Sequence, residues 1–129
     1  MNASRGGVPD PRTPVMVGVG QVSERLDTPG YQRRSAAELA SAAASAAVTD
    51  TGASPGQILA AIDTVAGVRQ FEISHPRARA PLGRSDNFPR SVTRRLGADP
   101  ARAILEVGGG QGPQHLVTEL AGTIAAGRA

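Results

Sequence analysis

Cysteine is missing from this sequence of 129 residues. Its absence excludes disulfide bonds, thiolate metal sites and cysteine nucleophiles together, because all three need a thiol. Long apolar runs are missing as well, and none approaches the ~20 residues that a membrane-spanning helix requires. Arg5 is not followed by an apolar stretch, so we predict no signal peptide and a cytoplasmic protein without membrane contact.

Lysine is absent too, and aromatic residues make up only 2% of the chain. All 14 basic residues are therefore arginine, and against 11 acidic residues they give a formal charge of +3. Arginine without lysine, together with abundant alanine and glycine, is typical of a GC-rich coding bias, so we give the charge little weight. The scarcity of aromatics disfavours a nucleic-acid partner, because bases stack on aromatic rings. A chain of this length forms one domain with a modest core.

The start of the chain predicts a tail and then a strand. Residues 1–12 are small, polar and broken by prolines, which indicates a disordered tail. Thr13–Val22 is nearly continuous in apolar residues, as in a strand buried on both faces. Gly18 and Gly20 lack the third glycine of a dinucleotide-binding fingerprint, so we interpret them as sites of close packing.

A helix and a second strand follow. Ser35–Asp50 is predicted to be helical, with a capping box formed by Ser35 and Glu38 and with Gly52 at its end. One smooth face of this helix, suited to lie on a sheet, consists of Leu39, Ala43, Ala46 and Ala47. Ser54-Pro55 begins a shorter turn that leads into a strand at Ala61–Val68. Strand, helix and strand at this spacing predict parallel neighbours joined by a right-handed crossover.

The middle of the chain is basic and irregular. Arg69–Asn87 has no periodicity, and a short helix is predicted over Pro89–Leu96. From residue 77 to residue 95 only Asp86 opposes a group of arginines, namely Arg77, Arg79, Arg84, Arg90, Arg94 and Arg95. Three interpretations stay open: a solvated face or subunit contact, contact with coenzyme phosphates, and contact with nucleic acid. His75 has no second ligand at metal spacing, so we predict a surface histidine.

The last unit of the chain is a strand, a glycine-rich elbow and a helix. Ala103–Val107 is a short apolar run, and three glycines from Gly108 to Gly110 are expected to turn the backbone through conformations that a Cβ forbids. Pro113 suits a first helical turn, and Gly127 is placed to end the helix. Such an elbow aims several N–H groups at one point, which suits an anion or a nucleophile. We assign His115, in the first turn, no role.

This elbow resembles the thiolase superfamily, in which a strand delivers a cysteine in the pattern Cys-x-Ser-Gly-Leu-Gln-Ala-(Val/Ile) to the start of a buried helix. Aligning Gly112-Pro113-Gln114 on the Gly-x-Gln core places the nucleophile position on Gly109, and the family's asparagine falls on Glu106. The phrase VGVGQ near the start is similar to the opening strand of thiolases related to sterol carrier protein. The resemblance implies an α/β fold: an incomplete thiolase-like amino-terminal half over residues 13–129, with about three mainly parallel strands and covering helices.

The family consists of acyltransferases of the acetyl-CoA acetyltransferase type, and its chain runs on for several hundred residues. Its carboxy-terminal half supplies a Gly-His-Pro histidine and a Cys-x-Gly cysteine, and neither motif exists in this sequence. We therefore expect a truncated or degenerate thiolase-like protein of acyl-CoA and lipid metabolism, inactive alone. The alternatives are an auxiliary subunit that binds acyl-CoA or a thiolase-like or aldolase partner, and an unrelated elbow that binds anions.

We predict no catalytic residue, because the family's nucleophile position falls on Gly109, and no metal or resident cofactor, with a coenzyme A thioester as the possible substrate. The candidate substrate-binding residues are the elbow positions Gly109, Gly110, Gln111 and Gly112 together with Arg90 and Arg94. Without the rest of the family's fold, Val15 to Val19 would form an uncovered apolar edge, so we expect a homo-oligomer or a thiolase-like partner chain.

Overall fold

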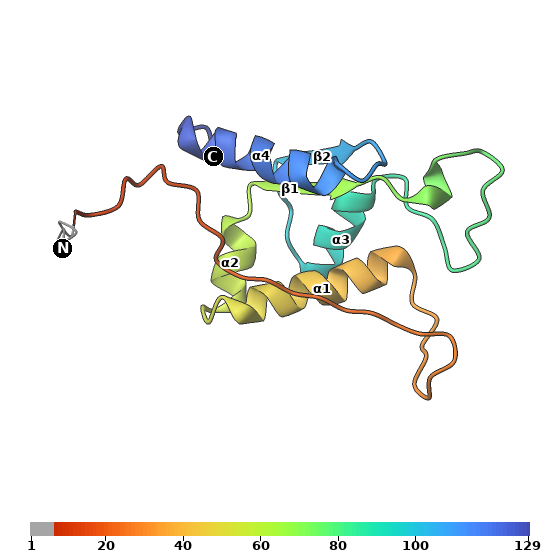
Figure 1. Cartoon of the computed structure of the whole chain (residues 1–129). Coiled ribbons are helices and arrows are strands. Elements are labelled where there is room, and N and C mark those ends of the chain that lie inside the picture. Colours follow the sequence, from red (N-terminus) through yellow and green to blue (C-terminus); the bar gives the residue numbers. More distant parts are fainter. Residues whose placement is uncertain (1–6) are drawn as a thin grey trace, which may run out of the picture.

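The structure is a computed structural model that describes residues 7–129, so the predicted tail lies only partly within the described residues. Its helices and strands follow in the order α1 (Ala36–Asp50), α2 (Pro55–Ala61), β1 (Thr64–Val68), the short 3-10 helix η1 (Phe71–Ile73), α3 (Phe88–Leu96), β2 (Arg102–Glu106) and α4 (Gly112–Ala125). Figure 1 shows this arrangement with α4 above the strands and α1 below them.

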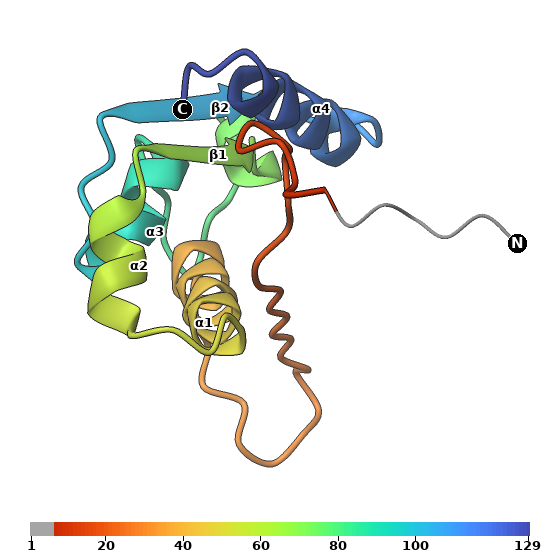
Figure 2. The ribbon, with the colours of Figure 1, turned by 90° about the vertical axis from the view of Figure 1, so that its left-hand side faces the viewer.

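The two strands form a parallel sheet that separates two helices. β1 and β2 pair in register from Thr64 opposite Arg102 to Val68 opposite Glu106. α3 connects the strands and packs on one face of the sheet, and α4 lies on the other face (Figure 2). α1 packs against α3 as an outer layer. The predicted α/β class with parallel strands is therefore confirmed.

The expected third strand is not formed. Thr13–Val22 runs along α1 as an extended segment without a strand partner, and we call it the leading segment (Figures 1 and 2). A strand needs a neighbour to accept its backbone hydrogen bonds, and within residues 7–129 β1 and β2 pair only with each other. The predicted crossover unit is consequently replaced by β1, α3 and β2. β1 also begins at Thr64 rather than Ala61, because α2 continues through Ala61.

Close packing by glycine holds the leading segment against α1. A Cβ on Gly18 would lie 2.3 Å from the carbonyl oxygen of Ala47, and one on Gly20 would lie 2.1 Å from that of Ala43. The predicted close packing at these glycines is confirmed, but their neighbour is a helix. The smooth alanine face predicted to lie on a sheet thus receives the leading segment.

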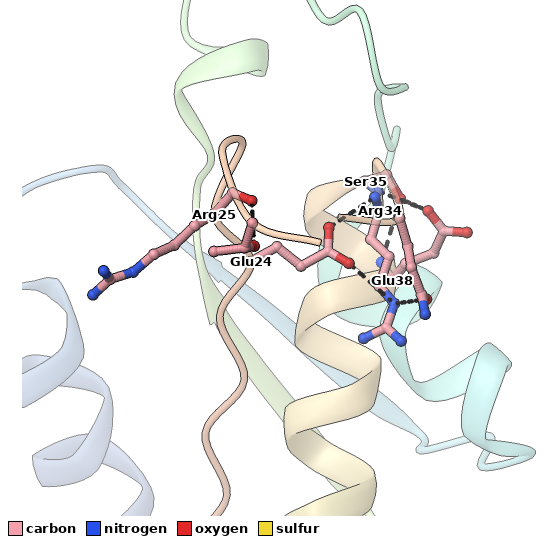
Figure 3. A network of polar contacts seen from close by, with 7 residues as sticks. Glu24, Arg25, Arg34, Ser35 and Glu38 are labelled. Carbon is pink, nitrogen blue, oxygen red and sulfur yellow. Dashed lines mark hydrogen bonds and ion pairs between the residues drawn. The ribbon is translucent and has the colours of Figure 1, made fainter. Parts of the chain in front are cut away.

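The start of α1 has the capping box that the sequence predicts. The Ser35 N–H donates to Glu38 Oε2 at 2.7 Å, and the Glu38 N–H donates to Ser35 Oγ at 3.3 Å. Beside it, Glu24 accepts the backbone N–H of Arg34 at 3.1 Å and lies 3.5 Å from the Arg34 Nε (Figure 3). The contacts of Glu24 tie the loop after the leading segment to the residue that precedes the N-cap of α1. Ser54, by contrast, makes no side-chain cap at the start of α2.

The core is small and lies between α1 and α3. Its buried centre is Ala37, Phe88 and Val92, and partly buried Ala36, Ala40, Ala44 and Leu96 pack around it. Alanine contributes little apolar area, so Phe88 supplies a large share of this core. Gly97 ends α3 in the left-handed conformation with φ of 79°, as its position predicts.

Candidate functional site

The elbow joins the end of β2 to the start of α4 at the surface. β2 ends at Glu106, and the Gly112 N–H, which begins α4, donates to the Gly109 carbonyl at 3.0 Å. Gly109, Gly110 and Gln111 are all exposed. The strand, turn and helix predicted for this stretch are confirmed.

The three glycines of the elbow do not adopt the glycine-specific backbone conformations that we predicted. None of Gly108, Gly109 and Gly110 has a positive φ, so the turn does not need backbone conformations reserved for glycine. Space matters at Gly112 instead, because a Cβ there would lie 3.2 Å from Val68 Cγ2. The buried Gly112 lets the first turn of α4 sit close to β1.

The elbow presents backbone donors to solvent. The N–H groups of Gly109, Gly110 and Gln111 have no hydrogen-bond partner among the residues that the structure describes. Free donors at the start of a 14-residue helix favour negative charge. Chemically, this arrangement can contribute an anion contact, but it contains no side chain able to attack a carbonyl group.

The space beside Gly109, the position that the thiolase resemblance assigns to the nucleophile, is occupied by a neighbouring amide. A Cβ on Gly109 would lie 2.6 Å from Gln111 Oε1 and 2.9 Å from Gln111 Nε2. The Gln111 side chain therefore lies across Gly109. Any side chain at position 109 requires the Gln111 amide to move aside.

A carboxylate and an imidazole that we did not predict to interact meet beside the elbow. Glu106, at the end of β2, is hydrogen-bonded through Oε2 to His115 Nδ1, and its Oε1 accepts the Val107 N–H at 2.9 Å. These two hydrogen bonds, the one from His115 first, hold the pKa of the Glu106 carboxyl below its ordinary value. Glu119, one turn further along α4, lies 3.7 Å from His115 Nε2.

This contact changes our assignment of His115, which has a partner and links β2 to α4. The available signal was that Glu106 and His115 both differ from the thiolase pattern, which has asparagine and a small residue there. The ring nitrogens of His115 face Glu106 and Glu119 separately, so the three groups do not converge on one point. Across residues 7–129 no cluster of three or more His, Asp or Glu side chains is arranged to hold a metal ion.

The predicted arginines lie around α3. A cavity of about 390 Å³, which we call the arginine groove, is lined by Arg84, Ser85, Asp86, Asn87, Arg90, Ser91, Arg94 and Arg95. Four guanidinium groups and one carboxylate make this groove cationic. It has the donors and the size to receive a phosphate-bearing group.

Arg90 and Arg94 differ in what they already contact. Arg90 donates to the carbonyls of Pro100 at 3.0 Å and Ala101 at 3.3 Å, which fixes the turn before β2. Its Nη1 also lies 3.9 Å from Asp99. Arg94 is exposed, and its side chain has no protein acceptor among the described residues. Arg94 is therefore the freer cation.

The structure does not bring the two halves of the predicted site together. Arg90 contacts the residues that precede β2, whereas the elbow follows β2 at its opposite end. α3 and α4 also lie on opposite faces of the sheet (Figure 2).

Another cavity, of about 300 Å³ and of mixed charge, lies between the start of α1 and the loop after β1. In the described part of the chain no helix is long and apolar enough to cross a membrane.

Comparison with known proteins supports one relationship. No protein-family model and no curated protein matches the chain. Among solved structures, the chain is similar to a monomeric SCP2-thiolase-like protein type 1 from Mycobacterium smegmatis, with 52% sequence identity and a TM-score of 0.71. The match covers 93% of this chain and 22% of that protein, so this chain spans about a fifth of the length of its relative.

Proposed function

The chain is thiolase-like, and from this premise we propose that it serves acyl-CoA metabolism by binding a coenzyme A thioester without transforming it. One half of this proposal is that the chain does not transform the thioester, and the absence of a side chain at Gly109 carries this half. Claisen chemistry needs a nucleophile to hold the acyl group and a base to form the carbanion. At position 109 the thiolase pattern has its cysteine, whereas this chain has no side chain and Gln111 lies across the gap.

An assay of acetoacetyl-CoA thiolysis and of acetyl-CoA condensation tests this half. We expect no turnover above a blank without protein. Gly109→Cys should remain inactive, because Gln111 occupies the site and the sequence lacks the family's Gly-His-Pro histidine. Turnover by the natural chain would refute the proposal. A thioester adduct on Gly109→Cys, detected by mass spectrometry, would show that the elbow still positions an acyl group.

The arginine groove supports the binding half of the proposal. Coenzyme A carries several phosphate charges, and guanidinium groups bind phosphate through charge-assisted hydrogen bonds. Arg94 is the exposed arginine of α3 that is free to make such a bond. The weak affinity that we expect should fall further as salt rises, because surface charges are screened within ~10 Å at 0.1 M salt.

Calorimetric titration with coenzyme A tests this half. Arg94→Ala should weaken binding about tenfold, which corresponds to ~1.4 kcal/mol. Arg77→Ala is the matched control, since it removes the same charge from an exposed position outside the groove. Equal losses in both variants, or an affinity that ignores salt, would exclude the groove as the phosphate site. Arg90→Ala is less informative because Arg90 also holds the turn before β2.

Two further parts of the proposal concern the partner of the protein and its location in the cell. A thiolase-like partner chain or a second copy would make it an auxiliary subunit, and the exposed leading segment favours such a contact. The cytoplasmic location predicted from the sequence fits a role with acyl-CoA, and cell fractionation tests it. If the elbow alone bound simple anions without selectivity for coenzyme A, the alternative of an anion-binding elbow would replace the proposal.

A further inference from the structure

The loop after β1 and the start of α1 form a cavity that includes no residue of the elbow, and we call it the loop cavity. Its volume is about 300 Å³, at the small end of the range for ligand pockets. The loop passes close to the N-cap of α1, because a Cβ on Gly83 would lie 4.0 Å from the Ser35 Cβ. The walls of the cavity come from the first turn of α1, from η1, from residues 82–85 and from α3.

The loop cavity combines an apolar wall with charged side chains of both signs. Ile73 and Leu82 of the loop and Phe88 of the core supply apolar surface. Two carboxylates and two guanidinium groups also line the cavity, namely those of Glu38, Glu72, Arg84 and Arg95. Because these charges balance, the lining is complementary to a ligand that carries one charge of each sign and an apolar body.

Glu38 and Arg95 already have partners within the protein. Glu38 accepts the Ser35 N–H at 2.7 Å and the Ser35 hydroxyl at 2.8 Å (Figure 3). These bonds, the backbone one first, hold the pKa of Glu38 below its ordinary value, and the charge of Arg95 acts in the same direction. Arg95 Nη1 donates to the Ser91 carbonyl at 2.9 Å. This pair therefore belongs to the capping box and to α3.

Glu72 and Arg84 retain the capacity to bind a ligand. Glu72 is partly buried in η1, and its carboxylate has no hydrogen-bond or ion-pair partner between residues 7 and 129. Arg84 Nη2 donates to the Ala78 carbonyl at 2.6 Å. A guanidinium group has further N–H donors, so Arg84 can still bind a carboxylate. An ammonium group is the matching partner for the carboxylate of Glu72.

We propose that the loop cavity binds a small zwitterion with an apolar side chain, of the chemical class of leucine and related amino acids. Its ammonium group pairs with Glu72, its carboxylate pairs with Arg84, and its side chain lies against the apolar wall. This inference goes beyond the proposed function and does not rest on coenzyme A binding. The loop cavity shares Arg84 and Arg95 with the arginine groove, whereas Arg94 lines the groove and not the cavity, so the two sites can be tested separately.

Titration of the natural chain with four ligands, followed through amide NMR shifts, tests the site. L-Leucine is compared with isocaproate, isoamylamine and glycine, which lack its amine, its carboxylate and its apolar side chain respectively. We expect leucine to shift the amides of η1 and of residues 82–85, and each of the other ligands to bind about tenfold more weakly. Shifts confined to other parts of the chain, or equal binding of leucine and isocaproate, would overturn the proposal.

Glu72→Gln separates recognition of the amine from a general effect on the loop. Leucine should bind this variant about tenfold more weakly, and its preference over isocaproate should disappear, because the carboxylate that holds the ammonium group is gone. Glu119→Gln is the matched control, since it removes the same charge from an exposed position outside the cavity. Arg94→Ala should also leave leucine binding unchanged. A preference for leucine that persists in Glu72→Gln, or a loss of leucine binding in Arg94→Ala, would refute the assignment of the site.

Discussion

At the scale of single residues, the elbow combines a position without a side chain and a side-chain contact across the turn. Gly109 leaves no nucleophile, while Glu106 and His115 form a hydrogen bond across the same turn. Glu106 is the last residue of β2 and His115 lies in the first turn of α4, so the bond fixes the helix relative to the sheet. The contact at this turn is a structural link between β2 and α4.

The Glu106 link should depend on pH in a direction that its pKa sets. Because the folded-state pKa is lowered, the stabilisation is present above the ordinary glutamate value of about 4.3 and is lost as pH falls through the folded value. Glu106→Gln should therefore lower the Tm at neutral pH and have little effect in acid. Thermal melts from pH 3 to pH 7 measure this difference.

Glu119→Gln is the control for that series, since Glu119 is 64% exposed and its carboxylate lies 3.7 Å from the imidazole. Its Tm should stay near that of the natural chain throughout. A difference between Glu106→Gln and the natural chain that persists unchanged at pH 3 would contradict the role of the ionised carboxylate.

At the scale of elements, the leading segment packs on α1 through its glycines and does not pair with a strand. A Cβ on Gly18 or Gly20 would collide with a carbonyl oxygen of α1, so only glycine at these positions lets the segment lie this close to the helix. The apolar run Val15 to Val19 then remains on the outside. The backbone of this extended segment can still form the hydrogen bonds of a strand, but no strand of the described residues pairs with it.

Gly20→Ala should release this segment. Its Cβ would lie 2.1 Å from the Ala43 carbonyl oxygen, so the chain must shift, at a cost of about 1–3 kcal/mol by analogy with overpacked cores. The Val19 amide should then exchange faster, because its bond to Asp50 depends on the same contact. Gly56→Ala is the control, since nothing lies within 4 Å of its Cβ and the substitution favours α2. Equal effects of both substitutions would argue against seating by Gly20.

At the scale of the whole molecule, stability rests on few large side chains. The chain has two phenylalanines, of which Phe88 is 8% exposed in the core and Phe71 is 90% exposed. Phe88 Cδ1 would lie 3.4 Å from a Cβ on Gly67 in β1, and Phe88 also packs in the cluster with α1. It therefore joins α3 to both the sheet and α1. Around it, the partners are mainly alanine.

Phe88→Ala should therefore destabilise the fold by about 3–5 kcal/mol, a large part of the stability of a small domain. Phe71→Ala should change it by no more than about 0.5 kcal/mol. Urea unfolding followed by circular dichroism compares the two variants. Similar midpoints for both would mean that the cluster between α1 and α3 is not the centre of the folded state.

The sequence by itself determined the features that depend on neighbours within a few residues. The capping box of Ser35 and Glu38, the helix end at Gly97 and the strand, turn and helix after Ala103 are local, because caps and turns satisfy nearby backbone groups. The lack of a cysteine nucleophile followed from composition alone, since a sequence without cysteine has no thiol in any fold.

Only the tertiary structure decided which distant segments meet. Thr13–Val22 has the composition of a strand, but pairing requires a partner strand with free backbone groups, and the segment lies on α1 instead. Whether an arginine is free or engaged, as for Arg94 and Arg90, depends on acceptors brought close by the fold. The contact of Glu106 with His115 likewise exists because β2 and α4 meet at one turn, a geometry that spacing along the chain does not specify.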